Sequence, residues 1–201
     1  MKEKKYILTK ETKELFGVTL YRIEAARDFS GVKKGDKGGW IEGEKNLSHE
    51  GDAVVSGNAW VSGDAVVSGD ARVYGNAWVS GNALVCGDAK VCGNALVCGD
   101  AKVSDYAKVY GNALVCGDAK IESDKDYIVF KNWWSSGRYF TWMRSNNMWK
   151  VGCFYGTGGE LIKKAYANSP ESGREYERVV RYVESILKDE DLKSKKESAD
   201  L

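Results

Sequence analysis

Histidine is the side chain that most often acts as a general base near neutral pH, and this chain contains only one, His49. A catalytic His49 would have to lie within hydrogen-bond distance of the hydroxyl or amine that it deprotonates. The alternative is a structural histidine that hydrogen-bonds a neighbouring segment. A zinc centre of three histidines is excluded by the count, and none of the five cysteines forms a Cys-x2-Cys pair. We therefore expect no metal and no cofactor, and no catalytic residue unless His49 is one.

Carboxylates and glycines offer two weaker candidates for a ligand-binding site. Asp52, Asp70 and Asp88 recur every eighteen residues, so stacked carboxylates could bind calcium, but aspartate after glycine is also ordinary turn chemistry. Residues 156–159, Gly-Thr-Gly-Gly, precede an expected helix and faintly resemble a phosphate-binding loop. They lack the Lys-Ser/Thr pair of a P-loop, which favours a turn and a helix start.

These candidates lie on or beside a repeat that dominates the sequence. From Gly51 to Glu122 the phrase Gly-[Asp/Asn]-Ala-x-[Val/Ile]-x occurs twelve times, and only Asp105 replaces the leading glycine. The alanine and the branched residue point to the same side of an extended segment, and the x residues point to the other side. Glycine followed by aspartate or asparagine favours a corner. The pattern predicts a solenoid of short parallel strands around a thin apolar core.

The outward residue between alanine and valine indicates how many strands form one coil. Sampled at every third hexad, it separates into one apolar column and two columns that end in lysine, which indicates four triangular coils of eighteen residues. An unbroken column of asparagine at the corners predicts a ladder of side-chain amides. The outward columns are Val54-Arg72-Lys90-Lys108, Trp60-Trp78-Leu96-Leu114 and Val66-Leu84-Lys102-Lys120, and the amide column is Asn58-Asn76-Asn94-Asn112.

The motif Val-x-Gly-[Asp/Asn]-Ala-x resembles the hexapeptide repeat of left-handed parallel β-helix proteins. The preceding LYRIEAARDF and VKKGDKGGWIEGEKNLSHEGDAVV are similar to the opening of hexapeptide-repeat proteins common in bacterial and prophage genomes. The resemblance implies a left-handed coil. One activity that it implies is acyl transfer, with one histidine as general base and acyl-coenzyme A between the subunits of a trimer. His49 falls in an inward valine slot of residues 45–50, at the solenoid entrance, which is a poor setting for a substrate and favours a structural role.

We expect a mainly β protein: a left-handed parallel β-helix with an N-terminal β-hairpin cap and a small C-terminal α+β domain. The hairpin would span residues 5–28 with its turn within 11–17. The α+β domain would hold three antiparallel strands, a helix from about residue 159, and a second helix that begins after Ser169-Pro170 and ends near residue 188. The expected divisions are 1–50 for the hairpin and cap, 51–122 for the β-helix, 123–188 for the α+β domain and 189–201 for a charged disordered tail.

The apolar outward column is the first candidate binding surface. A flat stripe of tryptophan and leucine along a solenoid is too large to remain in water. We expect a second copy of the chain to cover it, and the alternative cover is the C-terminal domain. The predicted oligomer interface consists of Trp60, Trp78, Leu96 and Leu114.

The C-terminal sheet is the second candidate. Residues 127–159 combine many aromatic side chains with lysine and arginine and contain no acid. Strand alternation places Arg138, Phe140, Trp142 and Arg144 on one face. If that face is accessible, it could stack on nucleic acid or grip an anionic ligand. The competing interpretation is a sheet with one buried face and one merely solvated face.

Composition sets the remaining limits. The net charge of +1 gives no general attraction to nucleic acid or to an anionic membrane, and no apolar run approaches a membrane span. The first ten residues lack the apolar core of a signal peptide, and an odd number of cysteines favours a reducing cytoplasm. Cys98 and Cys116 are stacked neighbours, close enough for a disulfide. Because in-register parallel side chains point alongside each other, we expect no bond between them.

Together these observations favour a non-enzymatic scaffold or binding protein of bacterial or phage origin that self-associates. The first alternative is a hexapeptide-repeat acyltransferase that uses His49. The second is a protein that binds nucleic acid or another anionic ligand through the C-terminal sheet. The sequence does not identify the partner.

Overall fold

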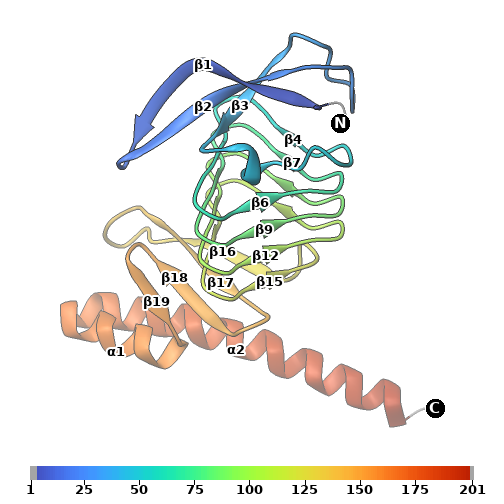
Figure 1. The fold of residues 1–201 in the computed structure, drawn as a ribbon. Helices are drawn as coiled ribbons and strands as arrows, with labels where there is room; N and C mark the ends of the chain where they lie inside the picture. Colours follow the sequence, from blue (N-terminus) through green and yellow to red (C-terminus); the bar gives the residue numbers. More distant parts are fainter. Residues whose placement is uncertain (1–3, 200–201) are drawn as a thin grey trace. The chain divides into compact units, whose positions relative to one another are not determined.

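A computed structural model describes residues 4–199 of the chain (Figure 1). The chain divides into two compact units. The first contains the residues up to Lys131 together with Tyr139–Tyr155, and the second contains Asn132–Arg138 together with the residues from Gly156 onward. The solenoid, its N-terminal hairpin and most of the C-terminal sheet belong to the first unit, and the helices belong to the second.

The repeat forms the predicted parallel solenoid. Each hexad contributes a strand of two residues, and every strand pairs in parallel register with the strand eighteen residues later, as in Lys90 with Lys108. The strands stack into sheets with the orders β13-β10-β7-β4, β15-β12-β9-β6 and, on the third side, β5-β8-β11-β14. The strands are β4 (Val54–Val55), β5 (Trp60–Val61), β6 (Val66–Val67), β7 (Arg72–Val73), β8 (Trp78–Val79), β9 (Leu84–Val85), β10 (Lys90–Val91), β11 (Leu96–Val97), β12 (Lys102–Val103), β13 (Lys108–Val109), β14 (Leu114–Val115) and β15 (Lys120–Ile121).

The inward slots form one continuous core. Every alanine and every branched residue of the repeat, from Ala53 to Ile121, is at most 1% exposed. Alanine alternates with valine because a thin triangular prism has room for one small and one medium side chain per strand. The predicted amide ladder is present as well, since the Asn58, Asn76 and Asn94 side chains each donate to the asparagine of the next coil.

Glycine is required at the corners for two reasons. Gly81 adopts a left-handed φ of 71°, and a Cβ there would lie 2.9 Å from the backbone nitrogen of Gly99 in the next coil. Asp105 has a φ of 55° and occupies the same kind of corner. Aspartate tolerates this conformation better than most residues, so the corner survives the one break in the glycine pattern.

The solenoid begins earlier than predicted. Strand β3 (Lys37–Ile41) pairs in parallel with β5, and Leu47 forms a bridge with Val67, so the array has about five turns rather than four. In this first coil Trp40 pairs with Trp60, an offset of twenty residues instead of eighteen. A 3-10 helix, η1 (Glu44–Asn46), forms one of its corners. The left hand of the coil stays a prediction.

The N-terminal cap is the predicted hairpin. Strands β1 (Tyr6–Leu15) and β2 (Val18–Ala25) are antiparallel, and β2 pairs with β3, so the hairpin extends the sheet of β5, β8, β11 and β14 (Figure 1). The turn is tighter than predicted. It consists of Phe16 and Gly17, which both have positive φ angles.

The C-terminal sheet has four strands rather than three. They are β16 (Tyr127–Lys131), β17 (Tyr139–Met143), β18 (Met148–Val151) and β19 (Phe154–Gly156). The last predicted strand is split because the turn before β19 contains Gly152 with a φ of 55°. Strand β17 also closes the end of the solenoid. The backbone N–H of Leu114 donates to Thr141 Oγ1 (2.8 Å), and that of Lys120 donates to Ser145 Oγ (2.8 Å).

The second unit contains two helices with the predicted caps. Helix α1 (Gly158–Asn168) begins at Thr157, whose hydroxyl accepts from the Glu160 N–H, so residues 156–159 form a turn and helix start. Helix α2 (Pro170–Ala199) follows Ser169. The prediction of a disordered tail from residue 189 is wrong as far as Ala199, because this segment lacks glycine and proline and continues α2. None of the helices in the described part of the chain has an apolar stretch long enough to cross a bilayer.

Candidate functional site

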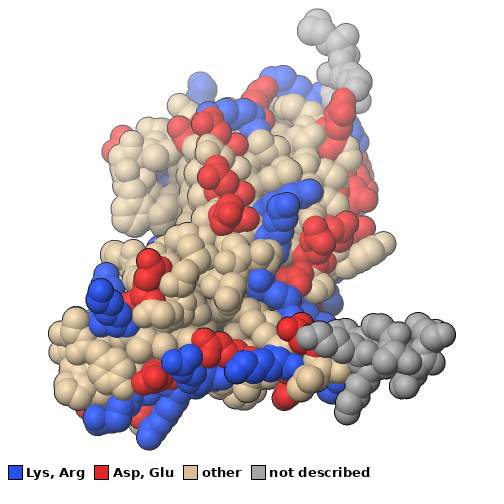
Figure 2. All heavy atoms as spheres, turned by 90° about the horizontal axis from the view of Figure 1, so that it is seen from below, with Lys and Arg blue, Asp and Glu red and all other residues tan. Residues whose placement is uncertain are grey.

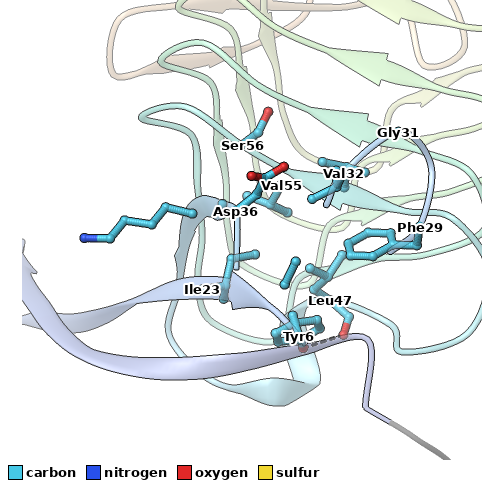
Figure 3. Close-up of a pocket in the computed structure, with 13 residues that line it drawn as sticks. Tyr6, Ile23, Phe29, Gly31, Val32, Asp36, Leu47, Val55 and Ser56 are labelled. Atoms are coloured by element: carbon cyan, nitrogen blue, oxygen red, sulfur yellow. Dashed lines mark hydrogen bonds between the residues drawn. The ribbon is translucent and has the colours of Figure 1, made fainter. Parts of the chain in front are cut away.

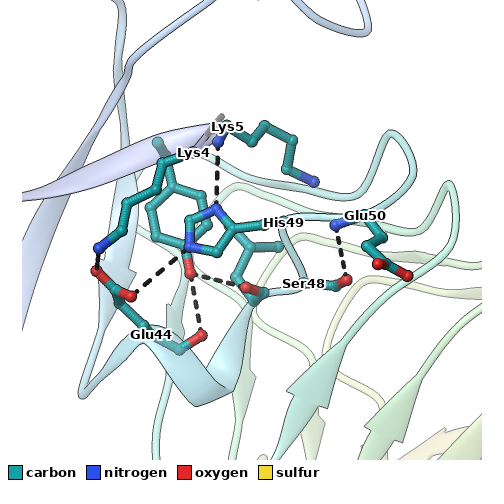
Figure 4. Close-up of polar contacts among 8 residues, drawn as sticks. Lys4, Lys5, Glu44, Ser48, His49 and Glu50 are labelled. Atoms are coloured by element: carbon teal, nitrogen blue, oxygen red, sulfur yellow. Dashed lines mark hydrogen bonds and ion pairs between the residues drawn. The ribbon is translucent and has the colours of Figure 1, made fainter. Parts of the chain in front are cut away.

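His49 is held in a structural cluster at the N-terminal end of the solenoid (Figure 4). The backbone N–H of Lys5 donates to His49 Nδ1 (3.2 Å), and the imidazole stacks on Tyr6 with 4.3 Å between ring centroids. His49 Nε2 lies 3.8 Å from a carboxylate oxygen of Glu44. Burial lowers the pKa of His49, which favours the neutral ring. The arrangement joins the first strand to the first coil.

The inward position predicted for His49 is wrong. Leu47, which is 1% exposed, occupies the slot that pairs with Val67. Eight residues separate Leu47 from the next inward valine, Val55, where the regular repeat has six. The two extra residues enlarge the corner that carries His49, so its side chain leaves the core and reaches the hairpin. The deviation arises because hexads cannot be extrapolated into a coil that lacks the glycine pattern.

Lys5 closes the same end of the solenoid. Its side chain is buried, and its Nζ donates to the carbonyl oxygens of Ala53 (2.8 Å) and Gly51 (3.3 Å). These carbonyls lie in the corner that leads into β4. Burial lowers the pKa of Lys5 to about 8, against an ordinary value of 10.5. The ammonium group therefore satisfies the backbone at an electrostatic cost.

The tryptophan face is the outward side of β3, β5, β8, β11 and β14, and the N-terminal hairpin covers its upper part. Trp60 is 9% exposed and stacks on Trp78 with 4.2 Å between ring centroids. Phe16, at the hairpin tip, stacks on Trp78 in turn (5.5 Å). Leu20 of β2 is fully buried against Trp60. Neither alternative considered from the sequence included this cover. The face consists of Trp40, Trp60, Trp78, Leu96 and Leu114, of which the two leucines are half-buried.

The accessible aromatic face predicted for the C-terminal sheet is wrong. Phe140 and Trp142 are fully buried, and the Trp142 indole N–H donates to Asn147 Oδ1 (2.8 Å). Both faces of β17 are buried, because its alternate residues meet the end of the solenoid. Arg144 donates to the Lys125 carbonyl. The four residues form no common accessible site.

Sequence reasoning missed a cavity beneath the N-terminal cap (Figure 3). It has a volume of about 310 Å³ and lies between the hairpin, the 29–36 loop and the first two coils. Asp36 and Ser56 supply polar atoms at one side of the cavity. A polar loop of this composition carries no periodic signal that would place it over the core. The apolar walls come from Tyr6, Ile23, Phe29, Val32, Leu47 and Val55.

The charged face is the outward side of β4, β7, β10 and β13, and it is open. Arg72, Lys90 and Lys108 stack in register along it, and all three are exposed. In the part of the chain that the structure describes, no carboxylate lies within ion-pair distance of these three cations. The 29–36 loop touches the upper end, where Arg72 donates to Ser30 Oγ (3.2 Å). Beside the cations lie the exposed column Asp52, Asp70 and Asp88 and the exposed rings of Tyr74, Tyr106 and Tyr110.

This face is hollowed. A depression of about 500 Å³ is lined by the cation column, the aspartate column, Ser30 and Tyr106. A second depression of about 360 Å³ lies beside it and includes Tyr74. It shares Gly31, Val32, Val54 and Ser56 with the cavity beneath the cap, so the apolar cavity and the charged face adjoin. Charges elsewhere are mixed: Figure 2 shows Lys and Arg interspersed with Asp and Glu on the side seen from below.

The corner carboxylates and two of the cysteines make contacts between adjacent coils. Within residues 4–199, no group of three histidine, cysteine, aspartate or glutamate side chains is arranged to hold a metal ion. Asp70 instead accepts from the Asp52 backbone N–H, which is corner chemistry. The expectation of no disulfide is wrong, since Cys98 and Cys116 are bonded across adjacent coils with 4.6 Å between their Cα atoms. Both cysteines occupy corner slots, where the side chains can turn toward each other.

Comparison with known families agrees with the solenoid geometry. A family model described as YdcK Beta solenoid repeat matches residues 65–81 and 71–87, which together span β6 to β9. The chain is a β-solenoid repeat protein. No curated protein sequence matches it. The matched segment is the part of the solenoid that carries Arg72 and Trp78, so it includes both the charged face and the tryptophan face.

Proposed function

We propose that this β-solenoid is a non-enzymatic binding scaffold and that the charged face is its ligand site. The observation that carries the proposal is the contrast between outward columns. The hairpin of the same chain covers the upper tryptophan column, whereas three in-register cations, three aspartates and three tyrosines stay exposed on the charged face. Exposed side chains of these types at regular spacing are suited to an extended ligand.

The position of His49 supports a non-enzymatic role over acyl transfer. A general base needs a free ring nitrogen that faces a substrate. Nδ1 accepts from the Lys5 backbone, Nε2 faces Glu44, and one ring face is stacked on Tyr6. The cavity of about 310 Å³ lies on the other side of Tyr6 and is not lined by His49. A binding role needs no such base.

A second proposal concerns self-association of the left-handed coil implied by the family resemblance. Phe16 is 82% exposed although it stacks on Trp78, and Leu96 and Leu114 continue the column below it. These side chains would anchor a second copy of the chain. Light scattering should show the wild type above its monomer mass of 22.2 kDa and the Leu96→Lys/Leu114→Lys variant at it. A monomeric wild type would contradict this proposal and leave the ligand site unaffected.

The binding function is tested by capture with matched variants. The tagged protein is immobilised and exposed to an extract of its native host, and the retained material is quantified for wild type and for Arg72→Ser/Lys90→Ser/Lys108→Ser. The control is Lys102→Ser/Lys120→Ser, which removes two exposed cations from the same repeat slot on the neighbouring sheet. We expect the triple variant to lose at least nine-tenths of one retained component and the control to retain it. Equal retention by all three proteins would contradict the proposal.

A further inference from the structure

We infer that the ligand of the charged face is an extended, hydroxyl-rich glycan chain. This inference rests on the proposed function and adds the chemical class of the ligand. Three features of the charged face support it: the neighbouring hydrogen-bond donors and acceptors, the exposed tyrosines, and the balance of positive and negative charges.

Donors and acceptors run side by side along the charged face. The two middle coils each present an aspartate at the corner and, two residues later, an outward cation: Asp70 with Arg72 and Asp88 with Lys90. The first coil adds Asp52 without a cation, and the last adds Lys108 with Tyr106 in the corner position. A carboxylate only accepts hydrogen bonds, and a guanidinium or ammonium only donates them. A hydroxyl does both, so a ligand with several hydroxyls on each residue can bond to both columns at once. The coils rise by about 4.8 Å, which is comparable with the length of one sugar ring.

Two exposed tyrosines flank the column of cations. Tyr106 is 77% exposed and lines the lower end together with Lys108, and Tyr74 is 40% exposed and lies beside Arg72 on the opposite side of the cations. A hydrogen bond with the Cys92 side chain raises the pKa of Tyr74, so its phenol stays protonated. An exposed tyrosine offers a flat apolar face for the C–H side of a sugar and a hydroxyl for hydrogen bonding.

Tyr106 also departs from the repeat in a way that the fold does not require. The residue after the leading position is aspartate or asparagine in the other eleven hexads, and tyrosine only here. Its ring makes no contribution to the core, because it points outward from the corner. An exposed aromatic at a position that the turn would fill with a small polar residue indicates a contact surface.

The charge balance separates a glycan from a nucleic acid. A nucleic acid presents a phosphate on every nucleotide, and phosphates that reached the three cations would also meet Asp52, Asp70 and Asp88. The equal numbers of the two signs leave no net field to attract a polyanion. The face also offers few of the large apolar anchors that protein partners use, since Val54 is its only aliphatic outward residue. A neutral or weakly charged glycan has no such conflict.

The test is binding of defined polymers to the intact chain. Affinity electrophoresis is run with dextran and soluble chitin oligosaccharides, and with two polyanions, polygalacturonate and a single-stranded poly-dT oligonucleotide, at 50 and 300 mM salt. We expect retardation by dextran or by the chitin oligosaccharides with less than a twofold change between the two salts, and none by either polyanion. Tyr106→Asn, which restores the repeat residue, and Tyr74→Ser should each weaken that binding at least tenfold. The control Tyr182→Ser removes from α2 a tyrosine whose exposure lies between those of Tyr74 and Tyr106, and this variant should bind as wild type.

The other outcomes overturn the inference in distinguishable ways. Thermal melting of each variant separates loss of binding from loss of folding. Binding of poly-dT that falls steeply with salt would replace the glycan by a nucleic acid. If neither dextran nor the chitin oligosaccharides bind but capture from the host extract still depends on Arg72, Lys90 and Lys108, the proposed function stands and the ligand class is wrong. If capture also does not depend on these three cations, both the proposed function and this inference fail.

Discussion

The tryptophan face and the charged face are two sides of one solenoid that differ only in their outward residues. Their inward alanines and valines are equally buried, and their strands follow the same eighteen-residue register. Trp60 is nevertheless 9% exposed beneath a hairpin, whereas Lys90, thirty residues later on the charged face, is exposed to solvent. The inward slots therefore determine the fold, whereas each outward column is free to acquire a separate role.

The first prediction concerns the apolar core of inward alanines and valines, which the two faces share. Val79→Asp places a carboxylate in the inward slot behind Trp78, where no partner is available. Burying an unpaired charge costs several kcal/mol, a large share of the stability of a domain, so we expect loss of the cooperative thermal transition. Circular dichroism melting measures this. A melting temperature near that of wild type would show that the inward assignment is wrong.

The second prediction concerns the cover of the tryptophan face. Leu20→Ala removes a fully buried side chain that packs on Trp40 and Trp60, and should lower the free energy of unfolding by about 2–4 kcal/mol. Because the cover loosens, tryptophan fluorescence should shift to the red in the folded variant. The matched control is Leu84→Ala, at a half-buried outward position in β9, on the face formed by β6, β9, β12 and β15. If the two variants lose equal stability without a fluorescence change, the hairpin is not the cover.

The third prediction tests the cap that lies above both faces. Between pH 8 and 10.5 the folded protein has released the Lys5 proton and the unfolded chain still holds it, so unfolding takes up a proton. The free energy of unfolding should therefore rise with pH across this window. Denaturant melts at pH 8, 9 and 10 are compared with those of Lys5→Met, in which this rise should be missing. Parallel pH profiles for the two proteins would contradict the buried ammonium.

The smallest effect on stability is expected on the charged face. The single variants are Arg72→Ser, Lys90→Ser and Lys108→Ser. Each removes an exposed side chain that has no ion-pair partner among the described residues, so each should alter the free energy of unfolding by less than about 0.5 kcal/mol. Single variants are measured by denaturant melts, with Lys102→Ser as the reference. A loss above about 1 kcal/mol for Lys90→Ser would indicate that the column stabilises the fold.

The regular part of this architecture follows from the sequence. The coil length, the strand register, the asparagine ladder and the helix start at Thr157 are all local consequences of residue type and spacing. Each depends on contacts between positions that are close in sequence or related by the repeat. For that reason the sequence alone predicts the pairing of Lys90 with Lys108.

The wrong predictions concern side chains whose burial depends on contacts between segments far apart in the sequence. The first coil has two extra residues and no glycine pattern, so His49 was placed in the core by extrapolation. The hairpin that covers Trp60 is nearly forty residues away, and alternation within β2 does not say which surface it packs on. Phe140 and Trp142 are buried because both sides of β17 are covered, which no strand pattern reveals. The open charged face was overlooked because its alternating signs cancel in the net charge.

The central claim is that one outward face stabilises the solenoid and the other binds a ligand. The measurement that tests it most directly compares Trp60→Ser with Arg72→Ser/Lys90→Ser/Lys108→Ser by denaturant unfolding and by capture from the host extract under native conditions. We predict that Trp60→Ser loses at least about 3 kcal/mol of unfolding free energy and retains its ligand per folded molecule. The triple variant should keep its stability to within about 1.5 kcal/mol and lose the ligand. If both variants lose stability, or both retain the ligand, the division between the two faces is wrong.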